Sequence, residues 1–170
     1  MSVTIETQRL LLDPISRDNA TDIFSEFTKD ITTFMYPKPA ENIEETYAFI
    51  DGAMEKNSRG EQLQMVIVDK VTGEFLGLAG LHDIQTRTPE LGIWLKKTAH
   101  DFHYGREAIT ELVNWARANL NFDYLKYPVD KRNIPSRKIP ESLGGIPGPE
   151  YKQTNLSGEE LDEIEYRIPK

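Results

Sequence analysis

The stretch from Glu90 to Ala108 constrains the fold more than any other part of the chain, because its hydrophobic period changes within a few residues. In its first part Leu91, Ile93 and Leu95 alternate with other residues, which is the period of two typical of a strand. Beyond Arg106 apolar residues recur every three or four positions, which is the period of a helix. The residues with this second spacing are Ala108, Ile109, Leu112, Val113, Ala116 and Leu120. The sequence therefore predicts a strand, a polar loop and a helix in direct succession.

A further strand is predicted at Tyr124–Asp130, so that strand, helix and strand form a βαβ unit. The loop after the first strand of such a unit lies at the carboxyl end of the sheet, where ligands bind in open α/β sheets. This loop closes on Tyr104-Gly105-Arg106. The helix that follows offers free backbone N–H groups and the positive end of its dipole, which suit a phosphate group.

The remaining elements are predicted from the same periods and from turn and cap residues. They are a strand at Thr4–Leu12, helices at Asn19–Lys29 and Ile43–Lys56, and strands at Leu63–Asp69, Glu74–Leu81, Tyr151–Asn155 and Ile164–Ile168. A last helix at Asn133–Leu143 should be short or kinked, because Pro140 lacks an N–H and crowds the preceding turn. Three antiparallel strands thus lead into the βαβ unit.

Four segments, spread over nearly the whole chain, resemble the GCN5-related N-acetyltransferase (GNAT) superfamily and follow its order. They are ETQRLLLDPI at Glu6–Ile15, ELGIWL at Glu90–Leu95, HYGREAITELVNWA at His103–Ala116 and NIPSRKIPESLGG at Asn133–Gly145. The branch they resemble most is the ribosomal-protein-alanine acetyltransferase type. The resemblance implies an α+β fold, with a mixed, mostly antiparallel twisted sheet flanked by helices, in one N-acetyltransferase domain over residues 1–170. It also implies acetyl-CoA as co-substrate and no metal.

The phosphate loop departs from the superfamily pattern of Gln or Arg, two residues, Gly, one residue, and Gly or Ala. His100, His103 and Gly105 stand at these three positions. Glycine lets the backbone approach a pyrophosphate and take a positive φ. His103 brings a β-carbon to such a position, although histidine enters the left-handed region more readily than most residues. Two interpretations stay open: an active acetyltransferase, and a degenerate module that binds an acyl-CoA or a partner protein without turnover.

By resemblance, several residues would bind the cofactor. The backbone of the central strand would pair with the pantetheine amides, the loop would hold the phosphates, and a residue before the last helix would contact the cofactor arm. These residues are Ile93, Trp94 and Leu95, then His103, Tyr104, Gly105 and Arg106, and finally Asn133. The alternatives are an ordinary sheet strand and an ordinary helix N-cap. The link between the first two helices would wall the acceptor site, which makes Phe34, Met35 and Tyr36 pocket candidates, although apolar residues are more often plain core.

Acetylation requires a base, because an amine with a pKa of about 10.4 is almost wholly protonated at neutral pH. Glu90 is the predicted catalytic base. A free carboxyl has a pKa of about 4.3, so burial or a bridging water would have to assist, and an exposed strand-end glutamate is the alternative. Ser136 is the predicted proton donor to the leaving thiolate, although a place in the first turn of a helix explains it equally well. His82, His100 and His103 are too scattered to predict a metal site.

Composition narrows the range of partners. The net charge of −8 argues against nucleic acid and suits a cationic amine, although acidity also serves solubility. The absence of cysteine excludes a cysteine-linked intermediate, which agrees with direct attack in a ternary complex. No apolar run reaches membrane-spanning length, so we expect a cytoplasmic protein with no membrane partner. The acceptor is expected to be a small-molecule amine or a protein N-terminus, and a homodimer is one oligomeric state left open.

Overall fold

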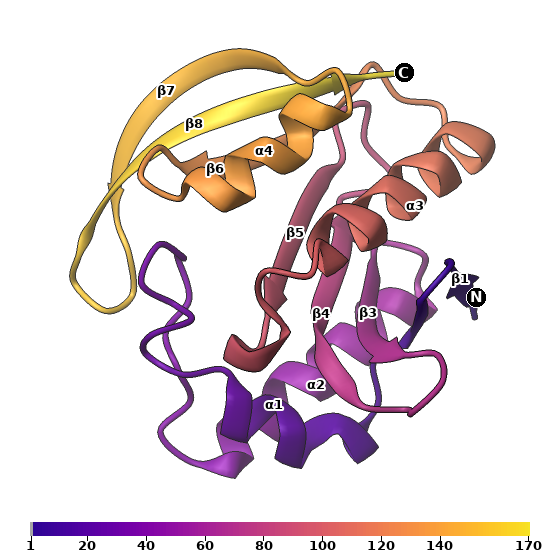
Figure 1. The fold of residues 1–170 in the computed structure, drawn as a ribbon, viewed down its shortest axis with the longest axis vertical. Helices are drawn as coiled ribbons and strands as arrows, with labels where there is room; N and C mark the ends of the chain where they lie inside the picture. Colours follow the sequence, from indigo (N-terminus) through magenta and orange to yellow (C-terminus); the bar gives the residue numbers. More distant parts are fainter. Residues whose placement is uncertain (1) are drawn as a thin grey trace.

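Eight strands form one sheet in residues 2–170, the part of the chain that this computed structural model describes (Figure 1). The strands are β1 Ile5–Glu6, β2 Leu10–Pro14, β3 Leu63–Asp69, β4 Phe75–His82, β5 Glu90–Leu95, β6 Tyr124–Asp130, β7 Ile146–Thr154 and β8 Glu160–Pro169. The α-helices are α1 Ala20–Glu26, α2 Ile43–Ser58, α3 Tyr104–Asn119 and α4 Ile134–Ser142. None of these helices combines the length and the apolar character needed to cross a membrane.

The strand order is β1-β2-β3-β4-β5-β6-β8-β7, and every neighbouring pair is antiparallel except β5 and β6. The parallel pair is joined through α3, which confirms the predicted βαβ unit. The predicted α+β architecture, with a mixed and mostly antiparallel sheet, is confirmed as well. Strands β3 and β6 have the predicted bounds, and α4 is short, as expected from Pro140.

Strands β5 and β6 meet at one end and then part. Their register holds a single pair, Glu90 with Lys126, where the backbone N–H of Lys126 donates to the carbonyl of Pro89 over 2.8 Å. Beyond that point the two strands diverge (Figure 1). Over the rest of β5 the edge that faces β6 therefore has no strand partner, and such an edge can accept an extended ligand as an added strand.

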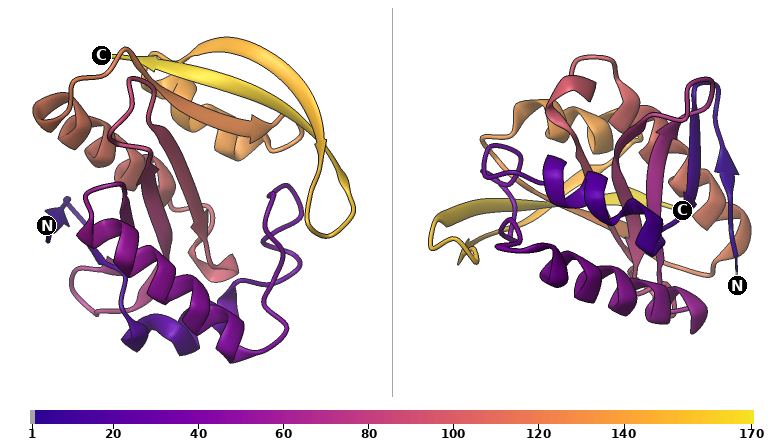
Figure 2. Two further views of the ribbon diagram at one scale, coloured as in Figure 1. Left: turned by 180° about the vertical axis from the view of Figure 1, so that it is seen from behind. Right: turned by 90° about the horizontal axis from the view of Figure 1, so that it is seen from below.

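Helices cover both faces of the sheet (Figure 2). On one face α3 buries its predicted apolar stripe, and Ala108, Ile109, Leu112, Val113 and Ala116 are each fully shielded from solvent. On the other face α1 and α2 bury Ile23 and Ile50 against β3 and β4. The alternation of side chains along β5 serves both layers, because Leu91 belongs to the first core and Trp94 packs against the second.

The predicted strand at Thr4–Leu12 is wrong, because the chain turns back within it. Strands β1 and β2 pair with each other, and Ile5 lies opposite Leu12. Between them the N–H of Thr7 donates to the Leu10 carbonyl, and the N–H of Leu10 donates to Thr7 Oγ1, each over 2.9 Å. A side chain that bonds to the nearby backbone in this way stabilises a turn at the expense of a continuous strand.

Candidate functional site

Helix α3 begins at a left-handed residue. His103 is its N-cap, with φ 62° and ψ 22°, and its side chain forms no capping hydrogen bond. This is the region that the glycine of the superfamily pattern adopts easily, so the loop keeps that backbone conformation despite the β-carbon. The first turn of a helix leaves N–H groups without an intrahelical carbonyl, and the positive end of the dipole lies there too. The start of α3 is therefore suited to bind an anion.

The hairpin at the start of the chain holds this helix end in place. Arg9 Nε lies 2.8 Å from Glu107 Oε1, and Thr7 Oγ1 donates to Glu107 Oε2 over 2.5 Å. Burial alone would raise the pKa of Glu107, but the hydrogen bonds from Thr7 and Arg9 outweigh it and lower that pKa. The Arg9 guanidinium also lies 4.5 Å from the centre of the Tyr104 ring, and its Nη2 donates to the Phe102 carbonyl over 2.9 Å.

A cavity of about 470 Å³ opens between the parted end of β5, the loop before α3, and α4. Every residue predicted to bind the cofactor lines it, as does Ser136. These are Ile93, Trp94, Leu95, His103, Tyr104, Gly105, Arg106, Asn133 and Ser136. The structure thus brings together nine of the ten predicted site residues in one place, while their roles stay predictions. We call this space the cofactor cavity.

Gly105 serves packing between elements. A β-carbon on it would lie 3.2 Å from Ile139 Cδ1 of α4 and 3.4 Å from Ile93 Cδ1 of β5. The glycine therefore allows α3 to approach its neighbours closely. A side chain at this position would contact these apolar tips. The sequence suggested a different role, in which the glycine lets the backbone approach a phosphate.

Asn133 and Ser136 form the start of α4. Asn133 Oδ1 accepts a hydrogen bond from the backbone N–H of Ser136 over 3.4 Å, so the capping role is present. Ser136 Oγ lies 2.7 Å from the hydroxyl of Tyr127, a residue that sequence reasoning missed. Burial raises the pKa of Tyr127 to about 12, so the phenol keeps its proton at neutral pH. Because Tyr127 lies on the same buried face of β6 as Leu125 and Val129, its sequence pattern is that of a core residue.

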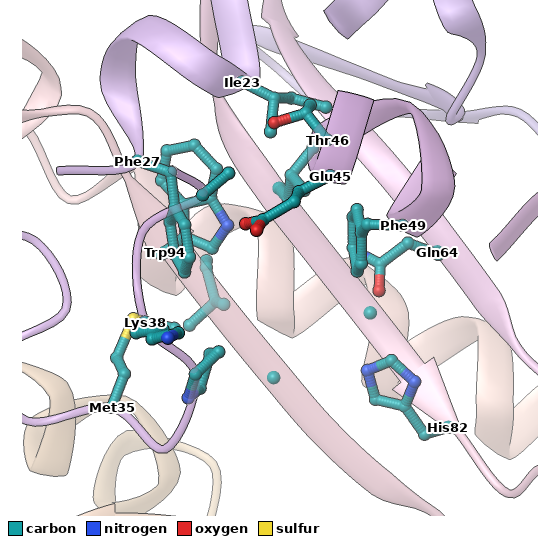
Figure 3. A pocket seen from close by; sticks show the side chains of 16 residues that line it. Ile23, Phe27, Met35, Lys38, Glu45, Thr46, Phe49, Gln64, His82 and Trp94 are labelled. Atoms are coloured by element: carbon teal, nitrogen blue, oxygen red, sulfur yellow. The ribbon is translucent and has the colours of Figure 1, made fainter. Parts of the chain in front are cut away.

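A second cavity of about 360 Å³ lies on the other face of the sheet, against α1, α2 and their link (Figure 3). Its walls are mostly apolar, with Ile23, Phe27, Met35, Phe49, Leu78 and Trp94 among them. Polar groups also reach it, chiefly Lys38, Glu45, Gln64 and His82. We call this space the acceptor-side cavity, and Met35, Ile93 and Trp94 line both cavities.

The link between α1 and α2 is held from the far end of the chain. Asn155 Nδ2 donates to the Met35 carbonyl over 3.1 Å, and the N–H of Leu156 donates to the Tyr36 carbonyl over 2.9 Å. Of the three pocket candidates in this link, only Met35 lines a cavity. Phe34 lies under the Arg132 guanidinium, and the side chain of Tyr36 is exposed.

Glu90 is the predicted site residue that lines neither cavity. It lies at the start of β5, opposite His82 of β4 and Lys126 of β6. Burial raises the pKa of its carboxyl, and the positive charge of Lys126 opposes that shift. Its neighbour His82 does line the acceptor-side cavity, and from sequence alone this histidine was considered only as a metal ligand. Glu90 as the base stays a prediction.

Comparison with known proteins agrees with this geometry. The chain is 24% identical over 144 residues to the Bacillus licheniformis protein named uncharacterized N-acetyltransferase p20, a match that covers 82% of this chain and 80% of that protein. The solved structure of RimL, a ribosomal L7/L12 alpha-N-protein acetyltransferase, superimposes with a TM-score of 0.86 at 15% identity, covering 100% of this chain and 96% of that one. The microcin C7 self-immunity acetyltransferase MccE, solved with acetyl-CoA and AMP, gives 0.84 at 18% identity and covers 96% and 93%.

At such identities the two structural likenesses establish the fold. The family follows from the sequence, because the model of the acetyltransferase (GNAT) domain matches residues 9–146, which is most of the chain. The chain therefore belongs to the GNAT family of acetyl-CoA-dependent acetyltransferases.

Proposed function

We propose that this protein transfers the acetyl group of acetyl-CoA to a primary amine that bears an apolar group, by direct attack within a ternary complex. One observation carries the proposal: Met35, Ile93 and Trp94 line both cavities. The two cavities are therefore adjacent at these residues, and in the proposed reaction a thioester held in one meets an amine held in the other. Proximity of this kind supplies much of the acceleration in a two-substrate reaction.

The cofactor cavity has the groups that acetyl-CoA needs. The first-turn N–H groups of α3 and the cationic side chains of Arg106 and Lys138 suit the phosphates. The edge of β5 at Ile93, which has no strand partner, suits the amides of the pantetheine arm, and Asn133 lines the same cavity. At Leu95 the backbone carbonyl already lies 2.9 Å from His100 Nε2. The left-handed backbone of His103 favours this role over the degenerate module, because the loop keeps the conformation of a glycine.

Ser136 is placed to assist the leaving group. Ser136 lines the cofactor cavity, and its Oγ lies 2.7 Å from the Tyr127 hydroxyl in the protein interior. In the proposed reaction Tyr127 is the donor of this bond, which leaves the Ser136 proton for the thiolate. A hydroxyl that is itself hydrogen-bonded by a protonated phenol is a better donor than an isolated one. In the proposed reaction the C–N bond forms, the C–S bond breaks, and the sulfur takes a proton as it leaves.

The acceptor-side cavity suggests the kind of amine. Aromatic and aliphatic side chains dominate its walls, and burying one apolar side chain of the acceptor contributes about 1.5–3 kcal/mol. An arylalkylamine, or a protein N-terminus whose first residue is large and apolar, fits these walls better than a polyamine. RimL is named for the alpha-amino group of a ribosomal protein, which supports a protein N-terminus as one acceptor class.

Two measurements test the proposal. Isothermal titration with acetyl-CoA should show binding, and release of free thiol should reveal turnover with phenethylamine and with peptides that begin with Met or Phe. Spermidine and peptides that begin with Ser or Ala serve as matched acceptors, for which we expect slower turnover. Binding without turnover of any of these amines would instead favour the acyl-CoA-binding module. An absence of binding would reject the cofactor cavity.

A further inference from the structure

A bare patch of backbone forms part of the wall of the acceptor-side cavity. Gly80 of β4 lies opposite Gly92 of β5 and opposite Gln64 of β3, so neither glycine adds a side chain to this point of the sheet. Gln64, Gly80, His82 and Gly92 all line the cavity, and Figure 3 shows the side chains of Gln64 and His82 there. The tips of Gln64 and His82 lie over Gly80, so the space above this glycine is where the two side chains meet at the cavity wall.

Gln64 points an oxygen at this space. Its Nε2 donates to the carbonyl of Ala79 over 3.4 Å, which fixes the orientation of the side-chain amide. Its Oε1 consequently faces the glycine and lies 3.2 Å from the position that a β-carbon on Gly80 would occupy. Within residues 2–170 this oxygen accepts no hydrogen bond.

His82 places its ring nitrogen Nε2 over the same glycine. Its Nδ1 lies 3.0 Å from Oε1 of Gln62, whose own Nε2 faces the Ala53 carbonyl at 3.5 Å. Because Nδ1 meets an oxygen that can only accept, Nδ1 carries the hydrogen and Nε2 does not. Nε2 lies 2.6 Å from the β-carbon position of Gly80 and 3.7 Å from that of Gly92. Two hydrogen-bond acceptors thus converge above Gly80.

We infer that Gln64 Oε1 and His82 Nε2 bind the amino group of the acceptor above Gly80, and that Nε2 removes its proton. This inference rests on the proposed acetyl transfer. An ammonium has three N–H donors and no acceptor, so it complements a pair of acceptors in a mostly apolar cavity. One proton passes to Nε2, and the freed nitrogen pair attacks the thioester carbon. As the C–S bond breaks, the second proton of the adduct nitrogen passes to the departing sulfur, which leaves as a thiol. The imidazolium returns the first proton to water.

The charges around His82 agree with such a role. Burial lowers the pKa of the imidazole, Asp83 opposes that shift, and Lys56 of α2 adds to it. Glu90 faces His82 from β5, while Glu45 and Lys38 line the same cavity from α2 and the link before it. A lowered pKa keeps the ring neutral at neutral pH, so the base is in its active form there. Gln62 acts as a positioning residue, because it sets the tautomer.

The first experiment compares His82→Gln with Glu90→Gln on two acceptors of nearly equal shape, phenethylamine and its β,β-difluoro analogue. Fluorine lowers the pKa of the amine, so the analogue needs less help from a base. We expect His82→Gln to reduce kcat/KM by about 100-fold with phenethylamine and by much less with the analogue, because a general base contributes about that much. A selective loss in Glu90→Gln, or an equal loss on both amines in His82→Gln, would overturn the assignment.

The second experiment uses the two glycines as a matched pair. An added β-carbon at Gly80 would press on the tips of His82 and Gln64, so the side chains can move aside while the backbone stays. We expect Gly80→Ala to raise KM for phenethylamine about tenfold, which is the loss of about 1.4 kcal/mol of binding. Gly92→Ala should cost less, because its β-carbon would have an ordinary 3.7 Å contact. Equal effects of the two changes would contradict the inference.

The same samples separate this inference from the proposed function. The affinity for acetyl-CoA should be unchanged in all four variants, which shows that the cofactor cavity survives. The midpoint of thermal unfolding should fall by a few degrees in Gly80→Ala and His82→Gln, because of the added carbon and the lost bond to Gln62. If the wild-type protein acetylates phenethylamine while His82→Gln is equally active, the inference alone fails. If no amine is acetylated, the NMR signals of the His82 ring still test whether His82 binds the amino group. A ring with hydrogen on Nδ1 whose Nε2 responds to added phenethylamine supports the site, and an unresponsive ring overturns it.

Discussion

The two cavities on either side of β5 use different chemical groups for binding. The cofactor cavity relies on backbone: the open end of a helix, the free edge of a strand and a helix cap. The acceptor-side cavity relies on side chains that α1, α2 and the link between them bring over the sheet. Single substitutions can replace a side chain but leave the backbone groups of a site in place. Substitutions that change which amine is accepted should therefore leave acetyl-CoA binding unchanged. Each prediction below tests whether the two cavities are independent in this way.

The largest effect is expected for Gly105→Val. Its side chain would enter the contact of α3 with Ile139 and Ile93, and overpacking of this kind costs about 1–3 kcal/mol. Displacement of the helix end should weaken acetyl-CoA binding by about tenfold to 100-fold, measured by titration calorimetry. Gly52→Ala is the control, because nothing lies within 4 Å of its added carbon, and it should leave affinity intact. Unchanged binding in Gly105→Val would mean that the cofactor cavity does not depend on this helix end.

Acid should loosen the cofactor side through Asp130, a buried residue that accepts hydrogen bonds from Arg132 and from the N–H of Asp162. Burial raises the pKa of Asp130, but these bonds outweigh it and lower that pKa from 3.8 to about 2. A lowered folded-state pKa stabilises the protein above the unfolded-state value. About 2 kcal/mol should therefore be lost as the pH falls from about 4 towards about 2.

Urea unfolding at a series of pH values measures this loss. Asp130→Asn should remove that part of the acid dependence and lower stability at neutral pH. An unaltered pH profile in the variant would show that the carboxylate does not anchor the turn before α4.

Phe49→Ala tests the other side of the comparison. Phe49 lines the acceptor-side cavity and does not line the cofactor cavity. The residue is 47% exposed, so removal of its ring should leave the fold nearly intact. We expect KM for phenethylamine to rise about tenfold, equivalent to about 1.4 kcal/mol of lost apolar contact, with no change in acetyl-CoA affinity. Initial rates over a range of amine concentrations measure the first, and titration the second. A parallel loss of affinity for phenethylamine and for acetyl-CoA would show that the two cavities do not function independently.

The smallest effect is expected for His103→Gly. Glycine relieves the strain of a left-handed β-carbon, worth about 1–2 kcal/mol, but adds backbone freedom to the unfolded chain. The two terms nearly cancel, so stability should rise by about 0.5 kcal/mol or less. Acetyl-CoA affinity should increase slightly if the ring crowds the loop. A loss of affinity would instead assign the imidazole a contact with the donor.

Much of the fold was readable from local pattern. The change of period around Glu90–Ala108 predicted β5, the loop and α3, and Leu63–Asp69 and Tyr124–Asp130 were predicted to the residue. The break between β1 and β2 was not predicted, because hydrophobic periodicity does not record the turn in which Thr7 bonds to the backbone of Leu10. It also contains no information about the contacts of Thr7 and Arg9 with the distant Glu107.

The same limit of local sequence patterns explains why the cofactor cavity was predicted better than the acceptor-side cavity. Residues of the cofactor cavity fall in contiguous segments, so a motif could collect them. Gln64, Gly80 and Gly92 meet only because β3, β4 and β5 adopt a particular register, and the register of strands is not written in any one of them. His82 was considered only as a metal ligand, Tyr127 has the sequence pattern of a core residue, and Glu90 was selected as the start of a strand without regard to the cavity.

The bonds from Asn155 and Leu156 to the link between α1 and α2 set an order of events during synthesis. The rim around Met35 acquires these partners only when the final hairpin emerges from the ribosome. The turn before α4 also waits for that hairpin, because the N–H of Asp162 donates to Asp130. Both cavities are therefore completed together, at the end of synthesis.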